Sequence, residues 1–396
     1  MPLFLVAAAA LLVARRPEML FRPEMYAESG PVFFMPTYFN DPLNLLVTPY
    51  AGYLHLIPRL VASLERLMPP AHVPLFEAVV AFAGTVAIAG FLASDRLANV
   101  LPSRWARYVL AAMLVVTPTA REVLGIEVNL QVYGSVYLVA LAMARPAPTR
   151  PWLVADIFGA IVFSLSGPFS LLLAPLFLAR RDRLTIVVGV CALAQLGVLL
   201  TSPRRDFQVP AIGDAIEAGM IRINSAVLGP VIAQLVPRTV AILLLPLLVV
   251  IAMRAGRRRG WAPFAVAACL IGAAGLVSGG VASEVAQYTH SFERFFVMAP
   301  IAVAAIILSG LASDERICFR ASQLAGALVL VGVLVHLRVP PLPDADWPTA
   351  SMCIGSDRAC LIEVAPRRFS FMWPGTNGEY PPPRDPSEVV GRALSD

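Results

Sequence analysis

The segment 71–94, AHVPLFEAVVAFAGTVAIAGFLAS, decides the fold class of this chain. Its only charged residue is Glu77, and it is long enough for a bilayer-spanning helix, which needs about 20 mostly apolar residues. Apolar runs of this kind recur along nearly the whole chain, which is 58% hydrophobic and 14% charged. Since about 25% of residues in soluble proteins are charged, the sequence predicts an all-α membrane protein with many spans.

The apolar runs predict about eleven transmembrane helices. They lie at 3–14, 71–94, 105–118, 129–144, 152–166, 168–179, 184–201, 237–254, 261–280, 294–311 and 320–337. The first run lacks the positively charged start and the cleavage site of a signal peptide, so it predicts a short first helix, which a start codon placed too late would explain. Within 152–179, the sequence Ser166-Gly167-Pro168 breaks helices and predicts two short helices joined by a turn.

Charge is divided unevenly between the loops. The short loops 95–107, 145–151, 180–183, 254–260 and 312–320 hold 14 arginines and 4 acids. The segments 15–70, 119–128, 202–238, 281–294 and 338–396 hold 17 arginines and 20 acids. Because arginine-rich short loops stay in the cytoplasm, the N-terminus is predicted to be cytoplasmic. The sequence then divides into a helical bundle at 1–337 and an extracytoplasmic tail at 338–396. The predicted external loops are 15–70, 119–128, 202–236 and 281–293.

The cytoplasmic loops are too short for a nucleotide-binding domain, and the chain has no GxxxxGK[ST] or GxGxxG motif. We therefore expect any chemistry on the outer face and no nucleic-acid partner. Cys353 and Cys360 share the tail, where a disulfide is predicted, with two free thiols as the alternative. No histidine is near this pair, so a zinc site is not expected there.

The first external loop is rich in aromatic residues, which suit a membrane interface. Its part from Tyr53 to Leu67 has apolar residues at helical spacing and predicts an amphipathic helix on the bilayer surface. Glu28 is the leading candidate for a general base, because Ser29-Gly30-Pro31 turns the chain just after it. A solvated loop carboxylate is the alternative for any one acid.

Arginine grips phosphate with two donors, so external arginines are candidates for holding a lipid-linked phosphate. Contact with ordinary lipid headgroups is the alternative. Polar residues at the mouth of the fourth span are further candidates, although such residues often only stabilise the fold. The candidate binding residues are Arg59, Arg204, Arg205, Arg222, Arg294, Tyr50, Tyr53, His55, Asn129, Gln131 and Tyr133.

Several stretches together resemble bacterial integral-membrane glycosyltransferases of the C-type superfamily. MYAESGPVFF is similar to the acidic motif of the first external loop of that family, and TPYAGYLHLIPRL to the segment that follows it. EVNLQVYGSVYLVAL and SLSGPFSLLLAPLFL resemble motifs of the middle spans. ERFFVMAP and CLIEVAPRRFSFMWPG resemble late segments more loosely. The resemblance covers nearly the whole chain, but no single motif in it is highly specific.

The resemblance implies an inverting transfer of a sugar from a polyprenyl-phosphate donor at the outer face of the bacterial inner membrane. The acceptor would be a glycan, a lipid or a protein, and a divalent metal, Mg or Mn, could assist. The family motif has Glu-Asp where this chain has Glu28-Ser29, so the base rests on Glu28, Asp41 or Glu122. A transporter or flippase of a lipid-linked saccharide, or a non-catalytic binder of one, is the alternative.

Overall fold

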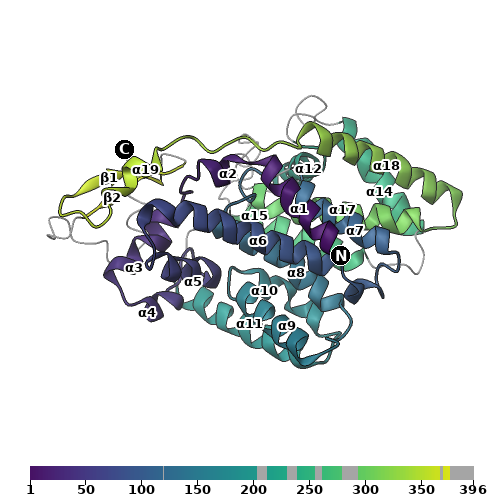
Figure 1. Ribbon diagram of the computed structural model, residues 1–396. Helices are drawn as coiled ribbons and strands as arrows, with labels where there is room; N and C mark the ends of the chain where they lie inside the picture. The colour runs from purple at the N-terminus through teal and green to yellow at the C-terminus, as the bar shows by residue number, and fades with distance from the viewer. Residues whose placement is uncertain are drawn as a thin grey trace.

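The computed structural model describes residues 1–118, 120–202, 212–229, 239–254, 261–278, 293–365 and 369–374. Within these ranges most residues are helical, so the predicted helical fold class is confirmed. The structure also contains a two-stranded antiparallel sheet in the tail, which the sequence analysis does not predict. Figure 1 shows the helices gathered into one elongated bundle, with the C-terminal elements at one end of it.

The elements before the middle of the chain include the short helices of the first loop. They are α1 Pro2–Arg15, α2 Glu18–Phe21, the π-helix η1 Ser29–Phe34, α3 Pro36–Phe39, α4 Pro42–Leu46, α5 Leu56–Glu65, η2 Pro70–His72, α6 Val73–Ala93, η3 Asp95–Leu97, α7 Arg104–Val116, η4 Glu127–Asn129, α8 Leu130–Met143, α9 Arg150–Ser164, α10 Phe169–Phe177 and α11 Arg183–Thr201. The later elements are α12 Ile212–Leu228, α14 Thr239–Arg254, α15 Ala262–Ser278, η5 Glu293–Phe296, α17 Met298–Leu311, α18 Arg316–Val335, α19 Trp347–Ser351, β1 Cys360–Ile362 and β2 Phe371–Trp373.

Four helices in the described ranges are long and apolar enough to cross a membrane. They are Pro70–Ala93, Arg183–Thr201, Arg294–Leu311 and Arg316–Val335. All four coincide with predicted spans. The other predicted spans also contain helices, but these are shorter. The total of eleven spans and the orientation of the chain therefore stay predictions.

The break predicted in the fifth apolar region is confirmed. α9 ends at Ser164 and α10 begins at Phe169. Between them Gly167 has a φ of +108°, in the left-handed region that residues with a side chain rarely adopt. The chain therefore reverses here, and Arg180 after α10 returns to the carbonyls of Leu141 and Ala144 near the end of α8.

Helix ends gather at two opposite ends of the bundle. At one end lies the segment 16–72, which we call loop 1, together with the start of α6; we call this the loop-1 end. Buried Arg15 ties three helix ends together there. Its guanidinium donates to the carbonyls of Thr117 after α7 at 2.8 Å and of Leu337 after α18 at 2.6 Å.

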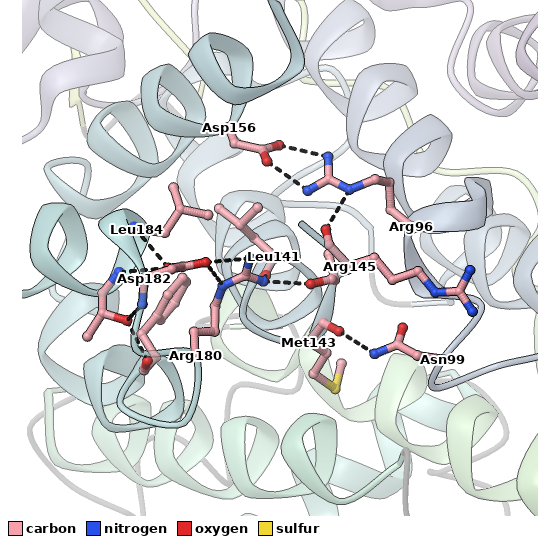
Figure 2. Close-up of polar contacts among 12 residues, drawn as sticks. Arg96, Asn99, Leu141, Met143, Arg145, Asp156, Arg180, Asp182 and Leu184 are labelled. Carbon is pink, nitrogen blue, oxygen red and sulfur yellow. Dashed lines mark hydrogen bonds and ion pairs between the residues drawn. The ribbon is translucent and has the colours of Figure 1, made fainter. Parts of the chain in front are cut away.

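The opposite end, where α6, α8 and α10 finish, we call the arginine end (Figure 2). Arg96 in η3 and Asp156 in α9 form a buried two-pronged ion pair, with distances of 3.1 and 2.7 Å. Arg96 also donates to the carbonyl of Arg145 at 2.8 Å. Asp182 accepts from the N–H groups of Leu184 and Thr185 and so caps α11. These contacts lock the short loops to one another.

Two predicted features take a different form. The loop expected over 202–236 contains α12, which packs against α17 and α18. α12 carries charged residues that lower its hydropathy, which explains why the apolar pattern does not reveal it. The surface helix expected over Tyr53–Leu67 is present as α5, but Ile57, Val61 and Glu65 on it are buried by protein.

The tail forms a small cap on loop 1. Trp347 of α19 and Trp373 of β2 are buried in one hydrophobic cluster with Met25 and Phe34 of loop 1. The indole N–H of Trp347 donates to the carbonyl of Pro70 at 3.0 Å. Cys353 and Cys360 form a disulfide inside this cap. Figure 1 shows the connection from α18 crossing the bundle to reach the cap.

Candidate functional site

The tail holds the backbone of loop 1 next to Glu28. The N–H of Ala27 donates to the carbonyl of Ala365 at 2.7 Å, and the N–H of Ala365 donates to the carbonyl of Met25 at 3.0 Å. Ala27 has a φ of +45°, in the left-handed region that is costly for a residue with a side chain. Two hydrogen bonds to the tail therefore hold a turn that aims the half-buried Glu28 side chain.

A π-helix, η1, begins at the residue after Glu28. π-Turns are rare and occur frequently at functional sites. Gly30 in this turn is tightly packed, since a Cβ atom there would lie 2.6 Å from Met25 Sδ and 2.6 Å from Phe371 Cε1. The structure thus has a turn at Ala27–Glu28 and a π-helix over Ser29–Phe34, where the sequence predicts a sharp turn just after Glu28.

Arg294 brings two of the predicted carboxylates together. It lies in η5, just before α17, and its backbone N–H donates to Glu122 Oε2 at 3.3 Å. Its guanidinium charge interacts most strongly with Glu122 and next with Glu28, and it also lies near the phenols of Tyr26 and Tyr53. We call these five residues the Arg294 cluster. They come from loop 1, the α7–α8 connection and η5, so the cluster forms only in the folded chain.

Tyr26 sits among the charges of this cluster. Burial raises the pKa of its phenol, and the negative charges of Glu122 and Glu28 raise it further, against a lowering by Arg294. The Tyr26 phenol is therefore a proton donor at neutral pH, beside two carboxylates that accept. Glu28 makes no hydrogen bond through its carboxylate with any other described residue.

His55 lies at the base of loop 1 within a set of aromatic rings. Its ring centroid is 4.5 Å from that of Tyr53, 5.4 Å from that of Phe33 and 5.5 Å from that of Tyr50. Burial, together with the positive charges of Arg59 and Arg294, lowers the pKa of His55 to about 3. Neutral His55 can donate through Nδ1 to the Tyr53 carbonyl, 3.2 Å away.

Arg59 is a second buried cation near the Arg294 cluster. It is 1% exposed and donates through Nη1 to the carbonyl of Val32 at 2.8 Å. Its guanidinium carbon lies 4.9 Å from the centre of the Phe33 ring. Among the residues that the structure describes, no carboxylate pairs with it, and its Nε and Nη2 have no hydrogen-bond partner. Arg59 is therefore a buried positive charge beneath loop 1 that no described carboxylate neutralises.

The turn at Ser166-Gly167 clamps this part of loop 1 from below. The N–H of Leu56 donates to the carbonyl of Leu165 at 3.0 Å, and the N–H of Gly167 donates to the carbonyl of Leu54 at 2.9 Å. Buried Gln195 of α11 links the two segments. It accepts from the N–H of Leu54 at 2.9 Å and donates to the carbonyl of Gly167 at 3.0 Å. His55 and Arg59 are thus positioned by helices far away in the sequence.

The remaining candidate residues lie elsewhere or have structural contacts. Asp41 is exposed and caps α4 by accepting from the N–H of Leu43 at 3.4 Å. Asn129 donates to the carbonyl of Glu122 at 2.6 Å, so it supports the cluster indirectly. Gln131 points at Gly167, and Tyr133 is fully buried.

Arg222 is buried on α12, in a helix and not in the loop that the sequence predicts. Arg204 and Arg205 lie outside the described residues. No hydrogen bond or ion pair joins Asp41 to the Arg294 cluster in the part of the chain that the structure describes. Among the predicted arginines, Arg294 and Arg59 are the ones that the described contacts place under loop 1, because span-end arginines look alike in the sequence.

Sequence reasoning missed a second group of acids beneath Glu28. Glu65 of α5, Glu77 of α6 and Glu127 of η4 are 1%, 5% and 3% exposed. Burial raises the pKa of Glu65, and the charges of Glu77 and Glu127 raise it further. Ser29 lies against Glu77. Glu77 and its neighbours are far apart in the sequence, and only the position of Glu77 inside an apolar run could have pointed to them.

The carboxylates of the Arg294 cluster are the side chains at this site that could hold a metal ion. Within the described ranges, no three histidine, cysteine, aspartate or glutamate side chains are arranged to hold a metal ion. Glu28 and Glu122 supply two carboxylates, and Mg²⁺ is commonly held by one or two carboxylates with substrate phosphates. The residues thus fit a metal only together with a phosphorylated ligand.

Comparison with known proteins adds no relative. No protein-family model matches the chain, and no curated protein sequence matches it.

Proposed function

We propose that this chain is a membrane glycosyltransferase that moves a sugar from a polyprenyl-phosphate donor to an acceptor hydroxyl on the extracytoplasmic face of a bacterial inner membrane. The observation that carries the proposal is the Arg294 cluster, in which one guanidinium lies beside two carboxylates at the loop-1 end. A hydroxyl nucleophile needs a base, and a departing phosphate needs positive charge. The cluster supplies both in one place.

The proposed reaction assigns one role to each group. Glu28 accepts the proton of the acceptor hydroxyl as the oxygen attacks the anomeric carbon. The bond from that carbon to the phosphate oxygen breaks, and polyprenyl phosphate leaves with the electron pair. A single displacement of this kind inverts the anomeric carbon. Arg294, with Arg59 nearby, stabilises the charge of the leaving phosphate.

Glu122 is assigned a positioning role. Its carboxylate accepts the N–H of Arg294 at 3.3 Å and is the strongest of the charges acting on that guanidinium. Asn129 donates to the carbonyl of Glu122 at 2.6 Å and fixes the segment that carries it. If a divalent metal is bound, Glu28 and Glu122 are the residues that would hold it, and it would supply further positive charge for the departing phosphate.

The proposal is tested with purified chain in nanodiscs and radiolabelled polyprenyl-phosphate sugars. The wild type is expected to release polyprenyl phosphate and to form a product of inverted anomeric configuration. Arg294→Gln is expected to lower the rate roughly 100-fold or more, as loss of a charge-stabilising donor does. Arg316→Gln, an exposed arginine at the arginine end, is the matched control and should keep the rate.

A flippase or transporter of a lipid-linked saccharide is the second candidate. The buried Glu65, Glu77 and Glu127 favour it, since ionisable residues inside membrane proteins often mark transport paths. Proteoliposomes decide between the two candidates. Movement of the labelled donor across the bilayer, without release of polyprenyl phosphate for any donor, would overturn the transferase proposal.

A further inference from the structure

A cavity of about 450 Å³ opens at the arginine end, far from the Arg294 cluster. Its walls are the α8–α9 connection at 146–149 and the first turns of α9 and α11. Figure 2 shows part of the wall, where Asp156, Arg180 and Asp182 lie. The polar groups here differ in whether they already have partners.

The two acids in the wall are neutralised by arginines. Asp156 is held by Arg96 at 2.7 Å, and Asp182 is held by Arg180 at 2.8 Å. Arg150 and Arg183 also line the cavity and are exposed, and neither pairs with an acid in the part of the chain that the structure describes. The cavity therefore has two positive charges without counter-ions.

The start of α9 adds hydrogen-bond donors. Its N-cap residue, Thr149, makes no capping hydrogen bond with its side chain, whereas α11 is capped by Asp182. The first intrahelical bond of α9 runs from the N–H of Leu153 to the carbonyl of Thr149 at 3.0 Å, so the N–H groups of Arg150 and Trp152 precede it. Free N–H groups at a helix start bind anions, and the helix dipole favours them.

The two helices that begin at the cavity pack side by side, and each exposes an apolar surface. On α9 it contains Trp152, Val154 and Phe158, which are 53%, 65% and 64% exposed. On α11 it contains Ile186 and Val190, which are 68% and 60% exposed. α11 is one of the four helices suited to cross a membrane. A soluble anion would leave these apolar side chains uncovered, whereas the acyl chains of a lipid would pack against them.

We infer that this cavity binds the phosphate of an anionic phospholipid, with its acyl chains on the exposed faces of α9 and α11. Arg150 and Arg183 contact the phosphate, and the N–H groups at the start of α9 donate hydrogen bonds to its remaining oxygens. Basic pockets between helices on the cytoplasmic side of membrane proteins suit anionic headgroups. The inference needs no assumption about the reaction at the loop-1 end.

The test is native mass spectrometry of the purified full chain titrated with phosphatidylglycerol or phosphatidylcholine. The wild type should hold one phosphatidylglycerol much more tightly than phosphatidylcholine. Arg150→Gln with Arg183→Gln should weaken phosphatidylglycerol binding roughly tenfold or more, because two charges contact the headgroup. Arg316→Gln with Arg320→Gln, two exposed arginines at the start of α18, is the charge-matched control and should bind as the wild type does.

Further arms separate the sources of phosphate and exclude misfolding. Competition by millimolar inorganic phosphate that removes the bound lipid would assign the cavity to a soluble anion and overturn the inference. Equal binding of the two lipids, or equal loss in both double variants, would also overturn it. Circular dichroism and size-exclusion chromatography check the folding of both double variants. Each profile should match that of the wild type, since the Arg96–Asp156 and Arg180–Asp182 ion pairs are left intact.

Discussion

Arg294 and Glu122 lie 172 positions apart, yet a hydrogen bond joins them in the fold. Each was a candidate from the sequence because of its residue type and its place near a span end. Their pairing had no local signal, because it depends on how α7, α8 and α17 pack. The same holds for Arg59, whose role follows from burial without an acidic partner, a property that the sequence does not show.

Asp156 offers a test at the residue scale. Asp156→Asn leaves the buried Arg96 without its carboxylate, and breaking a buried ion pair from one side costs about 3 kcal/mol. Unfolding in mixed detergent micelles should show a loss of this size. Asp314→Asn, at an exposed acid of the same end, should change stability little. Equal stability of the two variants would contradict the structural role of the pair.

At the scale of elements, the Ser-Gly-Pro turn between α9 and α10 could be predicted, because Gly and Pro act locally on the backbone. α12 could not, because its charged residues hide its apolar face. The disulfide in the tail was predicted, but the hydrogen bonds from the tail to Met25 and Ala27 were not, since pairing between distant segments leaves no pattern in either one.

Gly167→Ala tests the turn that clamps loop 1. At a φ of +108° the alanine is strained, and its Cβ would lie 2.8 Å from Gln131 Oε1. We expect a loss of about 1–3 kcal/mol in stability. Gly197→Ala in α11 is the control, since a Cβ there meets nothing within 4 Å and the change should be neutral or stabilising. Similar losses in both variants would contradict the account of the turn.

Glu24 makes the docking of the tail depend on pH. Burial, together with the negative charge of Asp344, raises the pKa of Glu24 to about 7. The folded state therefore binds the proton more tightly than the unfolded state, whose pKa is near 4.5. The stability from this group is full below about pH 4.5 and is lost as the pH rises through 7.

The measurement for Glu24 is amide hydrogen exchange in α19 at pH 5.5 and pH 8, corrected for the intrinsic rate. Protection should fall at pH 8 in the wild type by up to about 2 kcal/mol, within the range that such a shift allows. Glu24→Gln should remove most of this dependence. Protection that is the same at both pH values in the wild type would contradict the expected shift.

At the scale of the whole molecule, the structure separates a loop-1 end from an arginine end. The charge pattern of the sequence predicts the same division, with the arginine end in the cytoplasm. Composition could predict this much because insertion of the chain depends on loop charge. It could not fix the number of spans, since α1, α7, α8 and α10 are shorter than a bilayer crossing normally requires.

Labelling with a membrane-impermeant maleimide tests this orientation in intact cells. In a background where Cys191, Cys269 and Cys318 are replaced by serine, Asn44→Cys in loop 1 should react from outside. Ala312→Cys, exposed at the arginine end, should react only after the membrane is permeabilised. The reverse order of labelling would place loop 1 in the cytoplasm and remove the basis for chemistry on the outer face.

The most direct measurement compares Glu28→Gln with the wild type for release of polyprenyl phosphate from a labelled donor. We expect release by the wild type and a rate about 100-fold to 10,000-fold lower in Glu28→Gln, the range for loss of a general base. Asp41→Asn, which affects only a helix cap, should keep the wild-type rate. A Glu28→Gln variant that releases polyprenyl phosphate as fast as the wild type would contradict the central claim that Glu28 is the base of a transferase site.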